Sequence, residues 1–210
     1  MENILSIFVK AVFVENMVFA FFFGMCSYIA VSKSVKTAMG LGIAVTFVMV
    51  TTVPLNYLLN EYVLSPGALA WINPEFGTDG AHPVDLSFLS FIVFIAVIAS
   101  FVQLVEMVVE KFTPTLYNQL GIFLPLIAVN CAILGGSLFI QEREYATLGE
   151  ASAFALGSGV GWWLAIVLMA AIREKMAYSN VPAPLQGAGI TFILTGLMGI
   201  AFMTFLGIQL

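Results

Sequence analysis

The sequence predicts an all-α polytopic membrane protein with six transmembrane helices. Of its 210 residues, 61% are hydrophobic and only 9% are charged, whereas a soluble domain carries about 25% charged residues. Several apolar stretches reach the ~18 residues that indicate a membrane-spanning helix. The seven lysines and arginines are scattered without a basic patch, which argues against a nucleic-acid partner. The lipid bilayer is therefore the expected solvent.

Six segments are long and apolar enough to cross the bilayer. At ~1.5 Å per residue, each covers the ~30 Å of hydrocarbon. The segments are residues 4–31, 38–59, 86–109, 116–140, 150–172 and 187–208. We expect the whole chain, residues 1–210, to form one membrane domain with two halves, about 1–112 and 113–210.

Basic residues predict the orientation, because cytoplasmic loops carry an excess of lysine and arginine. The connections after the first, third and fifth segments contain five basic residues, namely Lys33, Lys36, Lys111, Arg173 and Lys175. The opposite side has only Lys10 and Arg143. Both termini are therefore expected outside the cytoplasm.

The two halves repeat a pattern of small residues. The first segment of each half contains one cysteine, Cys26 or Cys131, and the second contains a Gly-x-Gly sequence. These sequences are Gly40-Leu41-Gly42 and Gly157-Ser158-Gly159. An odd number of segments per half gives the halves opposite orientations. The pattern thus predicts an inverted 3+3 repeat, which is common where a functional site lies at the bilayer midplane.

The two cysteines are the only ones in the chain, and three interpretations are open. They could pack as small buried residues, or form a disulfide, although oxidising machinery acts outside the hydrocarbon. They could also ligate a metal. A [2Fe–2S] centre usually takes four thiolates, so a partner chain would have to provide two.

Straight helices would leave the two thiols at different depths. We therefore expect the first and fourth helices to be broken, which would bring both cysteines to the centre. Glycine and proline favour such breaks. The predicted break points are Gly24, Pro125 and Gly135-Gly136.

Two acidic residues lie in the interior of the predicted spans, away from their first residue, where charge is costly and marks functional sites. Glu106 is a candidate for cation entry or coupling; alternatively, it pairs with Lys111 or reaches the interface. Glu15, next to Asn16, is either an ion ligand or one member of a structural pair. Both glutamates are therefore candidates for a cation pathway.

The fifth segment has the features of a packing helix. Gly157 and Gly161, with Ala153 one turn earlier, form a small-xxx-small stripe that lets a neighbouring helix approach closely. Trp162 and Trp163 lie in mid-segment, so they are expected to be packing surfaces and not an interfacial belt.

Four stretches carry a resemblance to a known family. They are ENMVFAFFFGMCSYIAVSK, DLSFLSFIVFIAVIASFVQLVEMVVEKF, LYNQLGIFLPLIAVNCAILGG and GSGVGWWLAIVLMAAIREK. On these stretches the chain resembles the Nqr/Rnf family of small six-span redox-pump subunits, over essentially its whole length. The loop LSPGALAWINPEFG favours the Nqr branch over the related Rnf branch.

The resemblance implies a place in a six-subunit complex of the bacterial inner membrane. In that membrane, the orientation predicted from the basic residues puts both termini in the periplasm. Such a complex passes electrons from NADH through flavins and iron–sulfur centres to ubiquinone and exports sodium. The resemblance also implies a pairing with a homologous membrane protein of the complex, its D subunit. Cys26 and Cys131 would be two of the four ligands of a [2Fe–2S] cluster shared with it. The NADH, flavin and ubiquinone sites would lie on other subunits, so this chain alone has no complete active site.

Three alternatives to this function are open. An A subunit of an Rnf-type electron transport complex would exchange electrons between NADH and ferredoxin. A small-solute transporter could use the same inverted repeat, and a structural membrane scaffold would need neither iron nor solute. Iron analysis and EPR of the complex separate both redox subunits from the transporter and the scaffold, since only the redox subunits bind iron.

Overall fold

The computed structural model describes residues 4–64, 89–112, 124–143, 145 and 147–207. Within these ranges every regular element is a helix, and no strand occurs. The elements are α1 (Ile4–Val9), the π-helical turn η1 (Lys10–Val14), α2 (Met25–Val31), α3 (Val35–Leu59), the π-helical turn η2 (Asn60–Leu64), α4 (Ser90–Phe112), α6 (Leu124–Ala128), α7 (Cys131–Arg143), α8 (Leu148–Met176), η6 (Ala183–Leu185), α9 (Ala188–Met203) and η7 (Thr204–Gly207). The prediction of an all-α protein is confirmed for this part of the chain.

Four helical segments are long and apolar enough to cross a membrane. They are Val35–Leu64, Ser90–Phe112, Pro125–Arg143 and Leu148–Met176. The apolar helices Ile4–Val14 and Ala188–Met203 are shorter. Parts of three predicted spans, residues 86–88, 116–123 and 208, lie outside the described residues.

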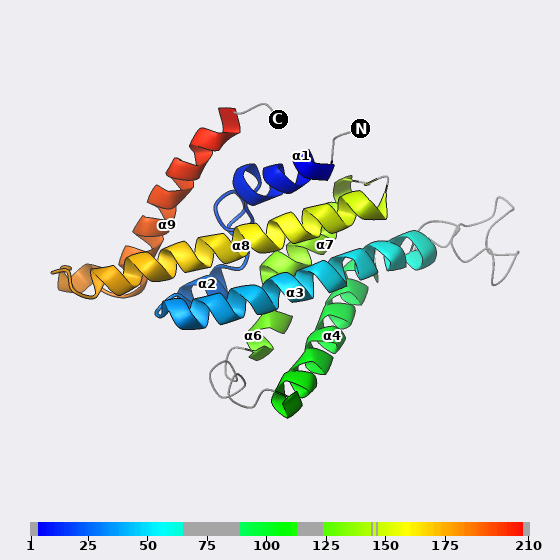
Figure 1. The fold of residues 1–210 in the computed structure, drawn as a ribbon, viewed down its shortest axis with the longest axis horizontal. Coiled ribbons are helices and arrows are strands. Elements are labelled where there is room, and N and C mark those ends of the chain that lie inside the picture. Colours follow the sequence, from blue (N-terminus) through cyan, green and yellow to red (C-terminus); the bar gives the residue numbers. More distant parts are fainter. Residues whose placement is uncertain (1–3, 65–88, 113–123, 144, 146, 208–210) are drawn as a thin grey trace, which may run out of the picture.

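The helices α3 and α8 form the centre of the molecule, side by side and antiparallel along its longest axis (Figure 1). Small residues let the two backbones approach. A Cβ on Gly159 would lie 3.0 Å from Thr46 Cα, and a Cβ on Gly42 would overlap the ring of Trp163. The Gly-x-Gly sequences of the two halves therefore serve the contact between their second helices.

A second face of α8 packs against α1 and η1. A Cβ on Gly157 would lie 2.8 Å from the Phe8 carbonyl oxygen, and one on Gly161 would lie 3.0 Å from that of Val12. The predicted small-xxx-small stripe is thus confirmed as a contact surface. The helix α8 also contacts α2, α7 and α9, so it packs against most of the described helices, whereas α4 contacts α3, α6 and α7.

The first predicted helix is broken, as expected. The π-helical turn η1 ends at Val14, and α2 begins only at Met25. Gly24 precedes α2 with φ 77°, a left-handed conformation that L side chains adopt only with strain. The prediction of a break at Gly24 is confirmed.

The fourth helix is broken between Ala128 and Cys131, but not at the predicted glycines. Gly135 and Gly136 lie inside α7, where a Cβ would overlap Phe23 or come within 2.9 Å of Met49 Cε. The predicted break at these two glycines is wrong, because they provide room for neighbouring side chains within a continuous helix. The predicted break at Pro125 borders residues 113–123, which lie outside the described part of the chain.

Candidate functional site

The first helix break is closed by Asn16. Its Nδ2 donates to the carbonyl oxygens of Val12 (3.0 Å) and Gly161 (2.8 Å). Its Oδ1 accepts from the backbone N–H of Val18 (3.0 Å) and Phe19 (3.4 Å). The side chain is 1% exposed. Every polar atom of this amide is thus satisfied within the chain, and the bonds replace backbone pairs that the break removed.

The second break has its own asparagine, Asn130, directly before Cys131. Its Oδ1 accepts from the backbone N–H of Ala132 at 3.0 Å, in the first turn of α7. This bond assigns the orientation of the amide, because the flipped amide would place a donor against a donor. The remaining donor, Nδ2, has no hydrogen-bond partner within the described chain, although Asn130 is only 4% exposed.

The two breaks meet. A Cβ placed on Gly24 would lie 2.8 Å from Asn130 Oδ1 and 3.2 Å from Ala132 Cβ. It would also overlap Trp162 Nε1. Trp162 is fully buried, and its Nε1 donor has no hydrogen-bond partner among the described residues. The residues that lead into α2 and α7 are therefore in contact beside the indole of Trp162, which lies midway along α8 (Leu148–Met176).

From this point α2 and α7 lead toward opposite ends of α8. At one end, Arg173 Nη1 donates to the Ile29 carbonyl oxygen (2.9 Å) and to Ser32 Oγ (2.6 Å), beside the end of α2. At the other end, the ring of Tyr145, just beyond α7, packs on that of Phe154 with centroids 5.7 Å apart. At ~1.5 Å per residue, Phe154 and Arg173 are ~28 Å apart along α8.

Both cysteines lie where these two helices begin. Cys26 is the second residue of α2 and Cys131 is the first residue of α7. Both thiols are free and exposed on the surface of this chain. The structure therefore contradicts a disulfide between them and a role as buried packing residues within the chain.

The chemistry of this pair fits half of an iron–sulfur ligand set. Thiolates are the usual ligands of such clusters, and [2Fe–2S] centres usually take four. Among the described residues, no group of three or more His, Cys, Asp or Glu side chains is placed to bind a metal. Because the chain has no third cysteine, the exposed thiols of Cys26 and Cys131 could form a four-thiolate cluster only with thiolates from another chain.

Glu15, at the start of the first break, is ion-paired. Its Oε2 contacts Arg143 Nη1, and its Oε1 lies 3.6 Å from Lys10 Nζ. The Arg143 guanidinium also lies 5.3 Å from the ring centroids of Phe139 and Phe154. Of the two interpretations of Glu15, structural pairing is observed, and both carboxylate oxygens face cations.

Glu106 lies in α4 and is half-buried. Within the described part of the chain no ion pair links it to Lys111 or to another cation. The pairing interpretation of Glu106 is therefore not observed, and its carboxylate is open to another partner.

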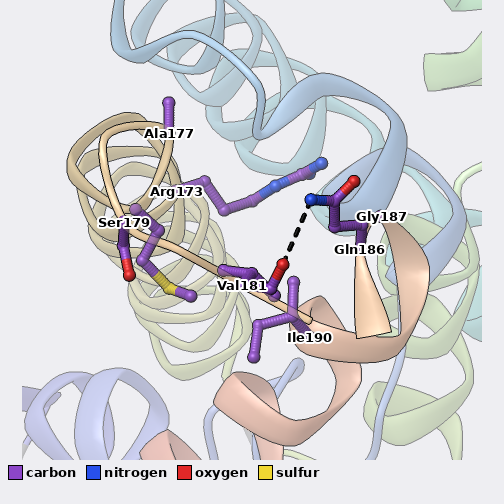
Figure 2. A pocket seen from close by; sticks show the side chains of 8 residues that line it. Arg173, Ala177, Ser179, Val181, Gln186, Gly187 and Ile190 are labelled. Atoms are coloured by element: carbon purple, nitrogen blue, oxygen red, sulfur yellow. Dashed lines mark hydrogen bonds between the residues drawn. The ribbon is translucent and has the colours of Figure 1, made fainter. Parts of the chain in front are cut away.

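A separate cavity of about 270 Å³ lies at the C-terminal end of α8 (Figure 2). The Gln186 side chain donates to the Val181 carbonyl oxygen at 3.2 Å in its wall. Arg173, which also lines it, is engaged with α2 through its bonds to Ile29 and Ser32. The cavity is thus at the opposite end of α2 from Cys26.

Sequence reasoning missed two groups at the junction. Asn130 is an amide inside an apolar run, directly before a cysteine. A polar residue at that position could have indicated a helix break in the sequence. Trp162 was correctly predicted to pack, but the sequence alone does not reveal that its N–H lacks a partner in the described chain. The burial and the hydrogen-bond partners of these two side chains depend on the contact between three segments that are far apart in the sequence.

The fold and the site define a class first: a polytopic membrane protein whose two cysteines lie at helix breaks. The sequence profile of the Rnf-Nqr family, described as "Rnf-Nqr subunit, membrane protein", matches residues 4–209. The chain belongs to this family.

Close relatives cover the chain from end to end. Proteins named as the E subunit of Na(+)-translocating NADH-quinone reductase are 57% identical over 210 residues in Stutzerimonas stutzeri and 59% identical over 210 residues in Psychromonas ingrahamii, with 100% of both chains covered. The protein of the same name in Rhodopirellula baltica is 58% identical over 212 residues, covering 100% of this chain and 99% of its own.

Proposed function

We propose that the chain serves as the E subunit of a Na+-translocating NADH:ubiquinone reductase, in the bacterial inner membrane. In this role Cys26 and Cys131 give two ligands to an intramembrane [2Fe–2S] cluster. The homologous D subunit, within a six-subunit complex, gives the other two. The cluster supplies one-electron transfer across the bilayer, coupled to sodium export. The reductase activity belongs to the complex, whose other subunits bind NADH, flavins and ubiquinone.

One observation carries this proposal: the two helix breaks meet halfway along α8, and each delivers an exposed thiol there. A metal site inside one chain would gather its ligands in the interior. Two thiols exposed on the surface of this chain, near the middle of α8, favour a cluster shared with a neighbouring subunit. The names and the identities of the relatives support the same assignment.

The geometry also supports the six-span inverted repeat over residues 1–210. The second helices of the two halves, α3 and α8, run antiparallel (Figure 1). The cysteine-bearing helices α2 and α7 also lead in opposite directions from a common point. Broken helices at the midplane are typical of inverted-repeat transport proteins.

The charged residues support periplasmic termini. Lys10 and Arg143, the two basic residues predicted on the outer side, meet at Glu15. Arg173, predicted on the cytoplasmic side, binds Ser32 at the other end of α8. The two basic residues predicted outside are thus at one end of α8 and Arg173 is at the other, in agreement with the positive-inside rule.

The decisive experiment replaces each cysteine by serine in the assembled complex. We expect Cys26→Ser and Cys131→Ser each to abolish the EPR signal of the shared cluster and to lower the iron content. Val129→Ser is the matched control, since Val129 lies in the break just before Cys131 and is 70% exposed. Unchanged iron in both cysteine variants would refute ligation.

Glu106 and Glu15 remain our candidates for a cation pathway. Glu106 is the stronger one, because its carboxylate is half-buried without an ion pair among the described residues. We expect Glu106→Gln to raise the sodium concentration for half-maximal quinone reduction. Glu110→Gln, an exposed neighbour on α4, is the control. An unaltered sodium dependence would remove Glu106 from the pathway.

A further inference from the structure

We propose that the cavity beside Arg173 binds the phosphate group of an anionic phospholipid. The cavity, of about 270 Å³, lies between the end of α8 and the start of α9 (Figure 2). This inference requires that the chain spans a bilayer, but it does not require the cluster at the cysteines. It adds a ligand site at the other end of α2.

Arg173 is a half-buried cation without an acidic partner among the described residues. The adjacent Glu174 is exposed and makes no ion pair with it. Arg173 Nη1 donates to the Ile29 carbonyl oxygen and to Ser32 Oγ, which are both neutral acceptors. These bonds hold the guanidinium in place without compensating its charge. A fixed, uncompensated guanidinium in the wall of a cavity favours an anionic ligand.

The other edge of the guanidinium is open to such a ligand. Arg173 Nε and Nη2 have no hydrogen-bond partner in the described chain, and neither is one of its fully buried unpaired atoms. Figure 2 shows the side chain extending from α8 toward Gln186, which also lines the cavity. Two N–H groups on one edge of a guanidinium match two oxygens of a phosphate. The bonds of Nη1 to α2 thus leave a bidentate edge for the ligand.

The rest of the wall is partly polar and partly apolar. Ser179 and Gln186 contribute polar side chains, whereas Val181 and Ile190 contribute apolar ones. The volume is just below the ~300–1,000 Å³ of small-molecule pockets, so it suits a headgroup and not a whole lipid. The negative end of the α8 dipole and the positive end of the α9 dipole both border the cavity, so its positive charge comes from Arg173.

An apolar stripe on α9 continues from the cavity along the helix. Ile193 and Leu197 follow Ile190 at i+3 and i+7, on the same face of α9. They are 48% and 58% exposed. A phospholipid with its phosphate at Arg173 would lay an acyl chain along this stripe. The continuity of the two surfaces favours a phospholipid over a free phosphate ion.

Three exposed lysines lie at the same end of the molecule. Lys33 follows Ser32, to which Arg173 donates. Lys36 lies in the first turn of α3, and Lys175 in the last turn of α8. Positive charge beside a membrane surface attracts anionic headgroups. The lysines therefore concentrate anionic lipid at this end, and Arg173 provides the fixed contact.

The test is photo-crosslinking of the full-length chain in its purified, delipidated complex, with phosphatidylglycerol that carries a photoreactive group beside its headgroup. We expect cross-links within residues 173–190. Arg173→Gln should raise the lipid concentration for half-maximal cross-linking by about tenfold or more, because a charge-assisted bidentate contact is lost. Lys175→Gln is the matched control: it removes the same charge at the same end, from a residue that does not line the cavity. In about 1 M salt, which screens exposed charges beyond ~3 Å, it should change that concentration less than about twofold.

A second variant keeps Arg173, since Arg173→Gln also removes the bonds to α2. Val181→Trp places an indole in the cavity and leaves the partners of Arg173, Ile29 and Ser32, unchanged. We expect it to weaken cross-linking by about tenfold or more as well, because the filled cavity has no room for the headgroup. Thermal melts without added lipid, and the iron content, verify that each variant is folded and assembled.

Competitors identify the ligand. Dioctanoyl phosphatidylglycerol should displace the cross-linked lipid, whereas inorganic phosphate or dioctanoyl phosphatidylcholine at the same concentration should not. Equal displacement by inorganic phosphate would overturn the lipid assignment. Unchanged cross-linking in Arg173→Gln and Val181→Trp would overturn the site, and so would the absence of cross-links within residues 173–190, which would indicate that a neighbouring subunit covers it. None of these results alters the iron content on which the proposed function depends.

Discussion

The two helix breaks differ in how the backbone groups around them are hydrogen-bonded. The first occupies residues 15–24, and Asn16 satisfies its freed backbone groups with four hydrogen bonds. The second occupies only residues 129–130, and Asn130 makes a single side-chain bond, to Ala132. The first break is also joined to the rest of the bundle by the ion pair between Glu15 and Arg143.

The two asparagines therefore differ in how much they are expected to contribute to the stability of the fold. Asn16 is so fully bonded that its removal should mainly cost stability. Asn130 makes one side-chain bond, to the N–H of Ala132, and its Nδ2 has no partner in the described chain, so its removal should cost less.

The largest effect is expected where the two breaks touch. Gly24→Ala places a side chain on a residue with φ 77° and against Asn130 and Trp162. We expect the free energy of unfolding to fall by about 2–5 kcal/mol, the sum of left-handed strain and overpacking. Thermal unfolding of the purified complex measures this loss.

Gly187→Ala is the control for Gly24→Ala. Gly187 also has positive φ, 94°, but nothing lies within 4 Å of its added Cβ. It should therefore show backbone strain without overpacking. A loss in Gly24→Ala of no more than about 1–2 kcal/mol, the cost of left-handed strain alone, would show that the breaks are not packed against each other.

A smaller effect should separate the two asparagines. Asn16→Ala leaves several buried backbone groups without partners, so we expect a loss of about 2–4 kcal/mol in the free energy of unfolding. Asn130→Ala removes one helix-capping bond and should cost about 1 kcal/mol. Thermal melts of the two variants, side by side, test the contrast, and the reverse order would contradict it.

The smallest effect concerns the ion pair that joins the first break to α7. A double-mutant cycle with Glu15→Gln and Arg143→Gln should give a coupling energy of about 1–2 kcal/mol, since both side chains are partly exposed. A coupling near zero in unfolding experiments would argue against a structural pair. A changed sodium dependence of turnover in Glu15→Gln would instead favour the cation pathway.

Much of this architecture could be predicted from the sequence, but the exact breaks could not. The left-handed Gly24 was predictable, because glycine is the residue that tolerates that conformation. The pair Gly135-Gly136 gave a wrong prediction, since glycine also makes room for neighbouring side chains inside a helix. The break at Asn130 depends on a side-chain bond that composition does not reveal.

The sequence by itself determined the class of protein, the positions of the apolar helices and the two thiols, because hydrophobic length and residue type are local properties. Only the tertiary structure decided that Gly24, Asn130 and Trp162 meet at mid-height of α8. The physical reason is that burial and hydrogen-bond satisfaction depend on contacts between segments far apart in the chain.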